Sequence, residues 1–381
     1  MTWPADADLC VLLTPRAVGG HEIALLGWLA DAVRSCGLRP LIVAPDAALS
    51  QACAEHGLAD WLHPASSQLA SGATAGARRR LSLRLLRSWP ADRPLLLAPG
   101  VLHAQAWLTA AAVMLGRKVW VYVPMTYCAK RMGYPVARLR DWLLAPWLRR
   151  VHAWITLDQR QADGLRRGWA VLAPVHQLPN LARLPATPPP APRSAGAAPL
   201  RVAFVGRFDA HQKGLDWLAS TLQQRSDWLG RYSWRFQGWG QAEAALQALA
   251  AQLAPGQMQV HGRAPLDDAL AASDVLLLAS RYEGVPLVAL EATLRGWPVV
   301  ASRSSGLADL LPSSSLFDLG DSDGLAKALD SLATAQARAQ AVAHAQRQYD
   351  AAGRADRYRQ ALQRLVQALQ HDRLAMAGLC P

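Results

Sequence analysis

The sequence predicts an α/β protein with two doubly wound domains, each built on a parallel sheet between layers of helices. Short apolar runs recur along the chain and are separated by longer segments with helical spacing, which is typical of parallel sheets. A stretch rich in Pro and Ala interrupts this pattern once, near the middle of the chain. The 381 residues, 51% of them hydrophobic, supply a core for each of two domains.

The first domain is predicted over residues 1–182. It opens with an apolar strand at residues 9–13, followed by Gly19 and Gly20 and by a helical pattern that begins at Glu22. Adjacent glycines permit a ligand to approach the backbone closely, and the helix offers its N-terminus. The alternative is a simple tight turn in which Glu22 complements the helix dipole.

Three further strands of this domain are predicted at residues 41–44, 95–98 and 119–123. Ligands of a doubly wound sheet lie at the carboxyl ends of its strands, which places His103 and residues 124–127 on the same rim as the glycine pair. A single histidine after a strand can equally be a structural residue.

The first domain ends near Pro179 and Asn180, where the alternating pattern stops. Residues 183–199 are rich in Pro and Ala, and such a run packs neither as a helix nor as a central strand. They are predicted to link the domains, and the second domain is predicted over residues 200–352.

The second domain opens with a strand, a loop and a helix within residues 200–218, and Arg207 and Lys213 bracket the loop. Two fixed cations at this place would neutralise an anionic ligand without a metal ion. Both are expected on an exposed loop. As isolated residues they would simply be solvated.

Residues 279–296 hold the most informative pattern of the chain, because a strand end, a loop and a helix start follow one another closely. Gly284 permits a sharp turn, Pro286 suits the first helical position, and the helix runs to Gly296. The amides of the first helical turn have no partner within the helix, so an anion would bind well there.

Two carboxylates stand in this unit, Glu283 and Glu291. Glu291 lies among apolar helix residues, where an unpaired carboxylate is unfavourable, so it needs a partner. That partner would be either the hydroxyl groups of a ligand or an arginine, and Glu283 would in the second case only complement the helix dipole.

The spacing of these glutamates across a strand, a Gly-Pro turn and a helix resembles the signature of the retaining glycosyltransferases of family 4, which have the GT-B fold. The resemblance implies two Rossmann-like domains that face a central cleft. It also implies that residues 353–381, with a helical run at 358–369, cross back to the first domain. It covers most of the second domain and fragments of the first.

The resemblance assigns roles to individual residues. Glu283 would lie at the transferred sugar, Glu291 would bind the ribose hydroxyls of the nucleotide, and the helix start would hold the diphosphate. The Gly-Arg and Lys-Gly pairs of the family match at Arg207 and Lys213. The residues implied in catalysis are Glu283, Arg207 and Lys213, and those implied in binding the nucleotide sugar are Gly19, Gly20, Arg207, Lys213, Arg263, Glu283, Gly284, Leu287, Val288 and Glu291.

The acceptor side departs from the family pattern, because Pro124 stands where the family often has a histidine. His103, Thr126 and Tyr127 are the acceptor-side candidates that remain, and the acceptor would be a sugar or a lipid-linked molecule.

The net charge of +12 favours an anionic partner. Residues 78–89 and 136–154 combine Arg, Leu and Trp, so both segments could lie on an anionic membrane, with the Trp rings at the level of the headgroups. Ordinary helices with a solvated basic face are the alternative. No nucleic-acid-binding module accompanies the charge, so nucleic acid is not expected.

No metal cofactor is expected. The two Asp-x-Asp triplets, at residues 6–8 and 321–323, are misplaced for a metal site, and the second suits a helix start with capping aspartates. The five cysteines are odd in number and fit no CxxC or zinc spacing, so reduced thiols are expected, and the N-terminus does not resemble a signal peptide. Both favour the cytoplasm, and the basic segments favour a peripheral position at the inner face of the membrane.

The sequence thus predicts a retaining, metal-independent hexosyltransferase-type enzyme that uses a nucleotide diphosphate sugar, in bacterial envelope polysaccharide or glycolipid assembly. Two alternatives stay open. A sugar-nucleotide epimerase with the same fold would use the same phosphate site, and a non-catalytic basic protein would bind a membrane or nucleic acid on a degenerate transferase fold.

Overall fold

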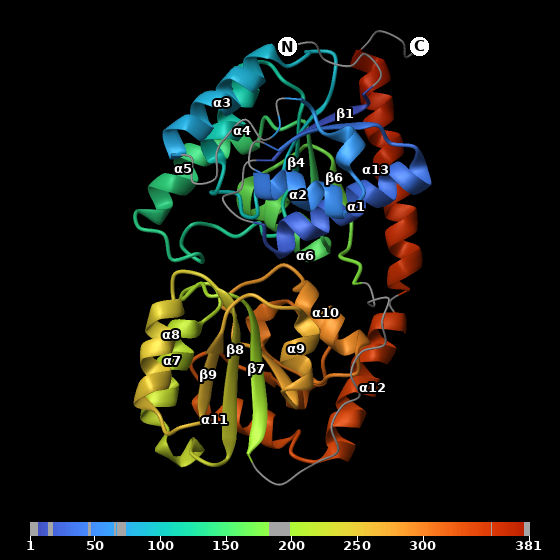
Figure 1. The fold of residues 1–381 in the computed structure, drawn as a ribbon. Coiled ribbons are helices and arrows are strands. Elements are labelled where there is room, and N and C mark those ends of the chain that lie inside the picture. Colours follow the sequence, from blue (N-terminus) through green and yellow to red (C-terminus); the bar gives the residue numbers. More distant parts are fainter. Residues whose placement is uncertain are drawn as a thin grey trace. The chain divides into compact units, whose positions relative to one another are not determined.

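The computed structural model describes residues 7–13, 18–44, 47–64, 66, 74–182, 199–351 and 353–376. The chain divides into two compact units (Figure 1): unit 1 comprises Met1–Asn180 and Ala355–Pro381, and unit 2 comprises Leu181–Arg354. The predicted linker at residues 183–199 lies outside the described residues except for Pro199.

Unit 1 contains a six-stranded parallel sheet with the order β2-β1-β3-β4-β5-β6. Its first five strands are buried along their whole length, which explains why they are apolar runs rather than alternating patterns. The strands are β1 (Leu9–Leu12), β2 (Pro40–Val43), β3 (Leu95–Leu97), β4 (Val119–Tyr122), β5 (Ala153–Thr156) and β6 (Val175–Gln177).

Helices cover both faces of this sheet (Figure 1). Apolar side chains of α3, α4 and α5 form one core with the strands, and α1 and α13 lie on the other face. The helices of unit 1 are α1 (Gly20–Cys36), α2 (Ala47–Glu55), α3 (Ala75–Ser88), α4 (Ala106–Met114), α5 (Ala137–Leu148), α6 (Gln159–Asp163) and α13 (Arg354–Met376).

Helix α13 returns to unit 1 after the chain has completed unit 2, as the resemblance implied. Polar contacts fix it along its length. The Tyr358 hydroxyl donates to Asp31 at 2.7 Å, and Arg373 pairs with Asp8. Near its C-terminal end, Asp372 accepts a hydrogen bond from Trp120 Nε1 at 3.0 Å and contacts His152 Nε2 at 2.7 Å.

Unit 2 contains a second six-stranded parallel sheet, with the order β12-β11-β10-β7-β8-β9. The chain builds one half outward from β7 and the other half outward from β10, so the order reverses between these two neighbours. The strands are β7 (Leu200–Arg207), β8 (Tyr232–Trp239), β9 (Met258–His261), β10 (Val275–Leu278), β11 (Val299–Ser302) and β12 (Leu316–Phe317).

Alternate side chains of the unit 2 strands enter different cores. Val275 and Leu277 pack with α7, α8 and α11, whereas Leu276 and Leu278 pack with α9, α10 and α12. Both predicted doubly wound domains are therefore confirmed. The helices are α7 (Leu215–Gln224), α8 (Glu243–Gln252), α9 (Leu266–Ala271), α10 (Leu287–Leu294), α11 (Ser322–Asp330) and α12 (Ala335–Ala351).

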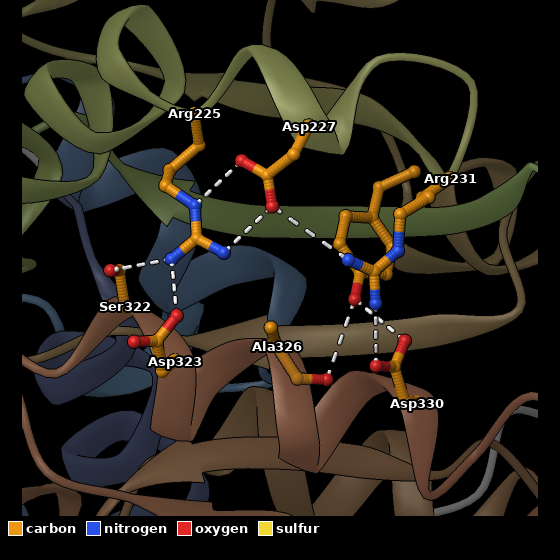
Figure 2. Close-up of polar contacts among 8 residues, drawn as sticks. Arg225, Asp227, Arg231, Ser322, Asp323, Ala326 and Asp330 are labelled. Atoms are coloured by element: carbon orange, nitrogen blue, oxygen red, sulfur yellow. Dashed lines mark hydrogen bonds and ion pairs between the residues drawn. The ribbon is translucent and has the colours of Figure 1, made fainter.

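An ion-pair network joins the amino-terminal end of β8 to α11 (Figure 2). Arg225 contacts Asp227 at 2.8 Å and Asp323 at 2.6 Å, and Arg231 contacts Asp330 at 2.7 Å. These side chains lie at the sheet edge opposite to the carboxyl ends of the strands, so the network belongs to the scaffold.

Among the described residues, no helix is both long enough and apolar enough to cross a bilayer.

Candidate functional site

The carboxyl ends of β7 and β10 meet at the place where the strand order of unit 2 reverses. In open parallel sheets a ligand binds outside the strand ends at such a switch point, because the loops there diverge to opposite faces. Arg207 ends β7, Lys213 follows it, and Glu283 follows β10, so the topology brings these three predicted residues to one edge.

Gly214 explains how the β7 loop reaches the end of β10. Its φ is +67°, and a Cβ atom at this position would lie 2.0 Å from the carbonyl oxygen of Ala279. Only glycine permits both this conformation and this approach. The loop is fixed further by Asp209 Oδ1, which accepts from the amide of Gln212 at 2.8 Å. The preceding residue, Lys213, is thereby directed at the β10 loop.

Lys213 and Glu283 form an ion pair through Nζ and Oε1. Both side chains are largely buried, with 15% and 9% of their surface exposed. The Ser280 hydroxyl donates to the same carboxylate oxygen at 3.0 Å. The expectation that Lys213 lies on an exposed loop is therefore wrong, because the packing of Gly214 against Ala279 carries the lysine inward.

Arg207 is half-exposed, with 51% of its side chain accessible to solvent. Its guanidinium donates to Gln212 Oε1 at 2.8 Å and lies 3.7 Å from Asp209. Arg207 is thus oriented by polar neighbours while still accessible to an anion.

The β10 loop leads into α10 through Gly284 and Pro286. Pro286 is the N-cap residue, one position earlier than predicted, and no side chain caps the helix. Its carbonyl accepts the amides of Ala289 and Leu290. The amides of Leu287 and Val288 occupy the first two helical positions, where a helix offers no internal acceptor, so an anion can bind there.

Glu291 lies two helical turns or less beyond this anion site, in the middle of α10. Burial raises the pKa of its carboxyl above the ordinary value, and Arg295 only partly opposes this effect. Arg295 Nε pairs instead with Asp267 at 2.8 Å, and its Nη1 donates to the backbone carbonyl of Glu291. No ion pair to the Glu291 carboxylate is found in the part of the chain that the structure describes, so the arginine alternative is not supported.

Arg263 follows β9, two strands away from β7, and its side chain is exposed. Nearby, the pKa of His261 is lowered by burial and by Arg235. The structure does not bring Arg263 into the cluster around Lys213.

The sequence prediction missed three serines that position the β10 loop. The carbonyl of Ser280 accepts hydrogen bonds from the hydroxyls of Ser302 at 2.5 Å and Ser304 at 2.7 Å. Ser280 is fully buried, and its own hydroxyl contacts Glu283. The sequence shows that Ser280 lies three residues before Glu283. Its partners come from β11 and from the turn after it, and they cannot be identified without the strand register.

In unit 1, the predicted glycine turn precedes α1. Glu22 Oε2 accepts the amide hydrogen of Gly19 at 2.8 Å, which agrees with a capping role for Glu22. Gly20 is exposed. His21, which lies between Gly20 and Glu22, has its Nε2 at 2.9 Å from the Ala98 carbonyl oxygen and stacks on the ring of Tyr122.

His103 packs against Tyr134 and Trp169, and its Nε2 lies 3.0 Å from Asp141 Oδ1. Only 5% of its side chain is exposed. Burial lowers its pKa, while Asp141 acts in the opposite direction. These contacts describe a structural histidine, the alternative that the sequence left open.

Thr126 and Tyr127 differ in how accessible they are. Thr126 is buried, its hydroxyl donates to Gln161, and its carbonyl accepts from Trp169 Nε1 at 3.0 Å. Tyr127 is half-buried, and the Cζ atom of Arg131 lies 4.4 Å from the centroid of its ring.

The Asp-x-Asp triplet at residues 321–323 has structural roles. Asp321 caps α11 by accepting the amide of Gly324 at 2.8 Å, as predicted, and Asp323 pairs with Arg225 (Figure 2). Residues 1–6, with the start of the first triplet, are outside the described part. Within the described ranges, no cluster of three or more His, Cys, Asp or Glu side chains is arranged to bind a metal ion.

The two Rossmann-like units and the solved structures that they resemble define the chain as a protein of the GT-B fold, as predicted. Residues 199–335 match the family model of the group 1 glycosyl transferases. This segment contains the whole Arg207, Lys213, Glu283 and Glu291 arrangement.

Individual relatives agree with this assignment of the fold. The chain is 29% identical to 2-deoxystreptamine glucosyltransferase from Streptomyces kanamyceticus over 255 residues, which span 60% of this chain and 63% of that relative. HepE from Anabaena, determined with UDP and glucose, superimposes with a TM-score of 0.70 at 16% identity, covering 95% of this chain and 98% of HepE. Sucrose-phosphate synthase from Thermosynechococcus elongatus superimposes with a TM-score of 0.61 at 16% identity, covering 97% of each chain.

Proposed function

We propose that this protein is a glycosyltransferase that moves a sugar from a nucleoside diphosphate sugar to a hydroxyl acceptor, with retention of configuration. The observation that carries the proposal is the convergence at one strand edge of two cations, free helix amides and two carboxylates in different environments. A diphosphate needs the cations and the amides, and a ribose needs an acceptor close to them.

Departure of the nucleoside diphosphate is the step that these groups would assist. Arg207, Lys213 and the amides of Leu287 and Val288 would bind the negative charge that develops as the anomeric C–O bond breaks. Lys213 is already directed by Glu283, so it needs little reorganisation to meet a phosphate oxygen.

The two glutamates would have different tasks. Glu291 would accept hydrogen bonds from the ribose hydroxyls, which would give a partner to its half-buried carboxylate; no ion pair to that carboxylate is found among the described residues. Glu283, held by Lys213 and Ser280, would lie at the transferred sugar. The acceptor hydroxyl would attack from the face that the leaving group has left, so no protein nucleophile is needed.

The comparisons support the substrate class. The curated relative is a glucosyltransferase, and HepE was determined with UDP and glucose. A hexose donor is accordingly part of the proposal. The cations of Arg207 and Lys213 take the place that a metal ion would have, so activity should survive EDTA. Loss of activity with the chelator, restored by manganese or magnesium, would overturn this point.

Assembly of bacterial envelope polysaccharide or glycolipid is the setting that we propose, with a sugar or lipid-linked acceptor and with the protein on the inner face of the membrane. The net charge of +12 supports an anionic surface as a partner.

A thermal-shift screen across nucleoside diphosphate sugars tests the proposal. The wild-type protein should be stabilised by the correct donor and by its nucleoside diphosphate, and Glu291→Gln should respond much less. If no nucleotide stabilises the wild-type protein, the result would favour the non-catalytic alternative over the transferase.

Product analysis then separates the transferase from the epimerase. With donor alone, an epimerase would convert the sugar nucleotide into its isomer, whereas the proposed transferase should leave its configuration unchanged. With acceptor present, NMR of the product should show the anomeric configuration of the donor.

A further inference from the structure

Helix α5 presents a row of large apolar side chains to solvent. Val136 just before the helix is 68% exposed, and Leu139, Trp142 and Leu143 are 52%, 70% and 54% exposed. The spacing of three and four residues places Leu139, Trp142 and Leu143 on one side of the helix, and Val136 precedes its first residue. A tryptophan with this exposure beside two leucines is unusual for a solvent-facing helix, because each side chain leaves apolar area in water.

The opposite side of α5 accounts for its stability without this row. Leu144 and Leu148 are buried in the core that α5 shares with α3 and α4. Asp141, the one acidic residue of the helix, lies 3.0 Å from the buried His103 ring and accepts the amide of Ala129. The exposed apolar row is therefore free to serve another purpose than folding of unit 1.

Positive charge surrounds this row. Six basic side chains of residues 128–150 are exposed, against the single acidic Asp141. Arg138 and Arg140 flank Leu139 on its two sides, because neighbouring residues of a helix are turned by about 100°. The basic residues are Lys130, Arg131, Arg138, Arg140, Arg149 and Arg150.

Helix α3 differs from α5 although its sequence has the same style. Its arginines are exposed at Arg79, Arg80, Arg84 and Arg87, but Leu85, Leu86 and the following Trp89 are buried in the core of unit 1. Insertion of Trp89 into a membrane, expected from the sequence, is therefore wrong. Helix α3 can contribute charge but no inserted ring.

We propose that the apolar row Val136, Leu139, Trp142 and Leu143 is a lipid-insertion face, which docks unit 1 on an anionic phospholipid bilayer. Tryptophan and leucine enter the region between headgroups and acyl chains, while the flanking arginines meet lipid phosphates. A second copy of the same face is the poorer occupant, because it would bring Arg138 and Arg140 against their own counterparts. This inference rests on the proposed function and adds the surface on which the enzyme would work.

Vesicle co-sedimentation of the full chain tests the face. The wild-type protein should bind vesicles of phosphatidylcholine with phosphatidylglycerol and not vesicles of phosphatidylcholine alone, and added salt should weaken this binding. Leu139→Ser with Trp142→Ser and Leu143→Ser should lower the partition coefficient about tenfold or more. Arg138→Gln with Arg140→Gln should lower it by a similar factor, about tenfold, at low salt only.

Leu172→Ser is the matched control, because Leu172 is 97% exposed in unit 1 but lies outside α5. It should bind vesicles as the wild type does. Equal binding by the triple variant and the wild type would overturn the proposal, and so would an equal loss in the control. A wild-type dimer that becomes monomeric in the triple variant would assign the row to a second copy instead.

Nucleotide binding separates this proposal from the proposed function. The triple variant should keep the thermal response to nucleoside diphosphates, and Glu291→Gln should keep vesicle binding. A wild-type protein that binds nucleotides but shows no preference for anionic vesicles leaves the transferase and removes the lipid face. Vesicle binding without any nucleotide response would keep the lipid face and remove the transferase.

Discussion

At the scale of single residues, the two glutamates of the β10–α10 segment show how environment separates equal chemical groups. Glu283 has a cation and a hydroxyl in contact with one carboxylate oxygen. Glu291 is half-buried in α10, and desolvation raises the pKa of its carboxyl. The first is oriented by the protein alone, whereas the second is suited to a ligand that brings donors.

Replacing Glu291 with Gln should act in opposite directions on stability and on binding. Because its folded-state pKa is raised, the carboxyl favours the folded state at low pH, and this contribution is lost as the pH rises through the raised pKa. At neutral pH the variant should therefore melt at a higher temperature than the wild type without ligand. Its nucleotide affinity should fall by ~1 to 3 kcal/mol.

The pH dependence gives an internal control. Wild-type nucleotide binding should weaken as the pH falls through the raised pKa of Glu291, and Glu291→Gln should lack this step. Calorimetric titration across the pH range measures both proteins. Unchanged affinity in the variant would remove Glu291 from the site.

Arg207→Ala and Lys213→Ala should both lower turnover, yet they should differ in stability. Arg207 is half exposed, so its removal should leave the melting temperature almost unchanged. Lys213→Ala leaves the buried Glu283 carboxylate without its cation, a change that typically costs about 3 to 5 kcal/mol. Lys213→Met combined with Glu283→Gln should recover much of this stability but no activity. Full turnover in Arg207→Ala or in Lys213→Ala would exclude that residue from catalysis.

At the scale of elements, the strand order of unit 2 explains why the site forms where it does. The loops after β7 and β10 become neighbours because the chain turns to the other side of β7 after β9. Gly214 then lets the first loop pack on the second. The site thus depends on backbone packing as much as on charged side chains.

Gly214→Ala should test this packing. The substitution combines a left-handed φ with a Cβ at 2.0 Å from the Ala279 carbonyl, so the loop must move. Gly256→Ala is the matched control, since Gly256 also has a positive φ, of +82°, but no atom within 4 Å of its Cβ. The control should lose about 1 to 2 kcal/mol of unfolding free energy. Gly214→Ala should lose more and should also bind nucleotide less well; equal losses would show that the contact is unimportant.

Sequence reasoning identified the first four strands of unit 1 and the α10 signature because both depend on local pattern. It missed β5, whose Trp154 is fully buried, so the expectation that this ring lies at the lipid headgroups is wrong. A strand that is buried on both faces has apolar side chains at every position. The turn with Gly284 and Pro286 predicts a helix start, which the structure places within one residue of the predicted position. Sequence reasoning did not foresee that Lys213 meets Glu283 or that Ser302 supports Ser280. Those contacts join residues that are distant in the chain and depend on strand register.

The same limit applies to the first domain. His103 looked like a rim residue because it follows a strand, but the loop turns its ring under Tyr134 and Trp169. Thr126 is likewise satisfied by Gln161. Periodicity does not encode how a loop folds over a sheet.

At the scale of the whole molecule, unit 1 is completed by the helix that follows unit 2 in the sequence. Asp372 is central to this attachment, because it contacts Trp120 on β4 and His152, the residue just before β5. Asp372 thus holds the C-terminal part of α13, as the Tyr358 hydroxyl on Asp31 holds its N-terminal part.

Asp372→Ala should weaken the docking of α13 by ~1 to 3 kcal/mol, since two polar partners lose their acceptor. Asp356→Ala is the control: Asp356 is exposed and pairs with Arg359 on the same helix, so its removal should change stability by about 0.5 kcal/mol or less. Limited proteolysis and thermal melting measure both. Similar behaviour of the two variants would contradict a special role for Asp372.

The position of α13 has a consequence for how the protein is made. A ribosome releases residues 1–180 first, but the helix that contacts Asp8, Asp31 and Trp120 is translated only after all of unit 2. During synthesis α1 is available to cover its part of this sheet face, but the part that α13 covers stays exposed while unit 2 is produced. Unit 2 is contiguous and can form as it emerges, so the earlier half of the gene encodes the half of the protein that matures last.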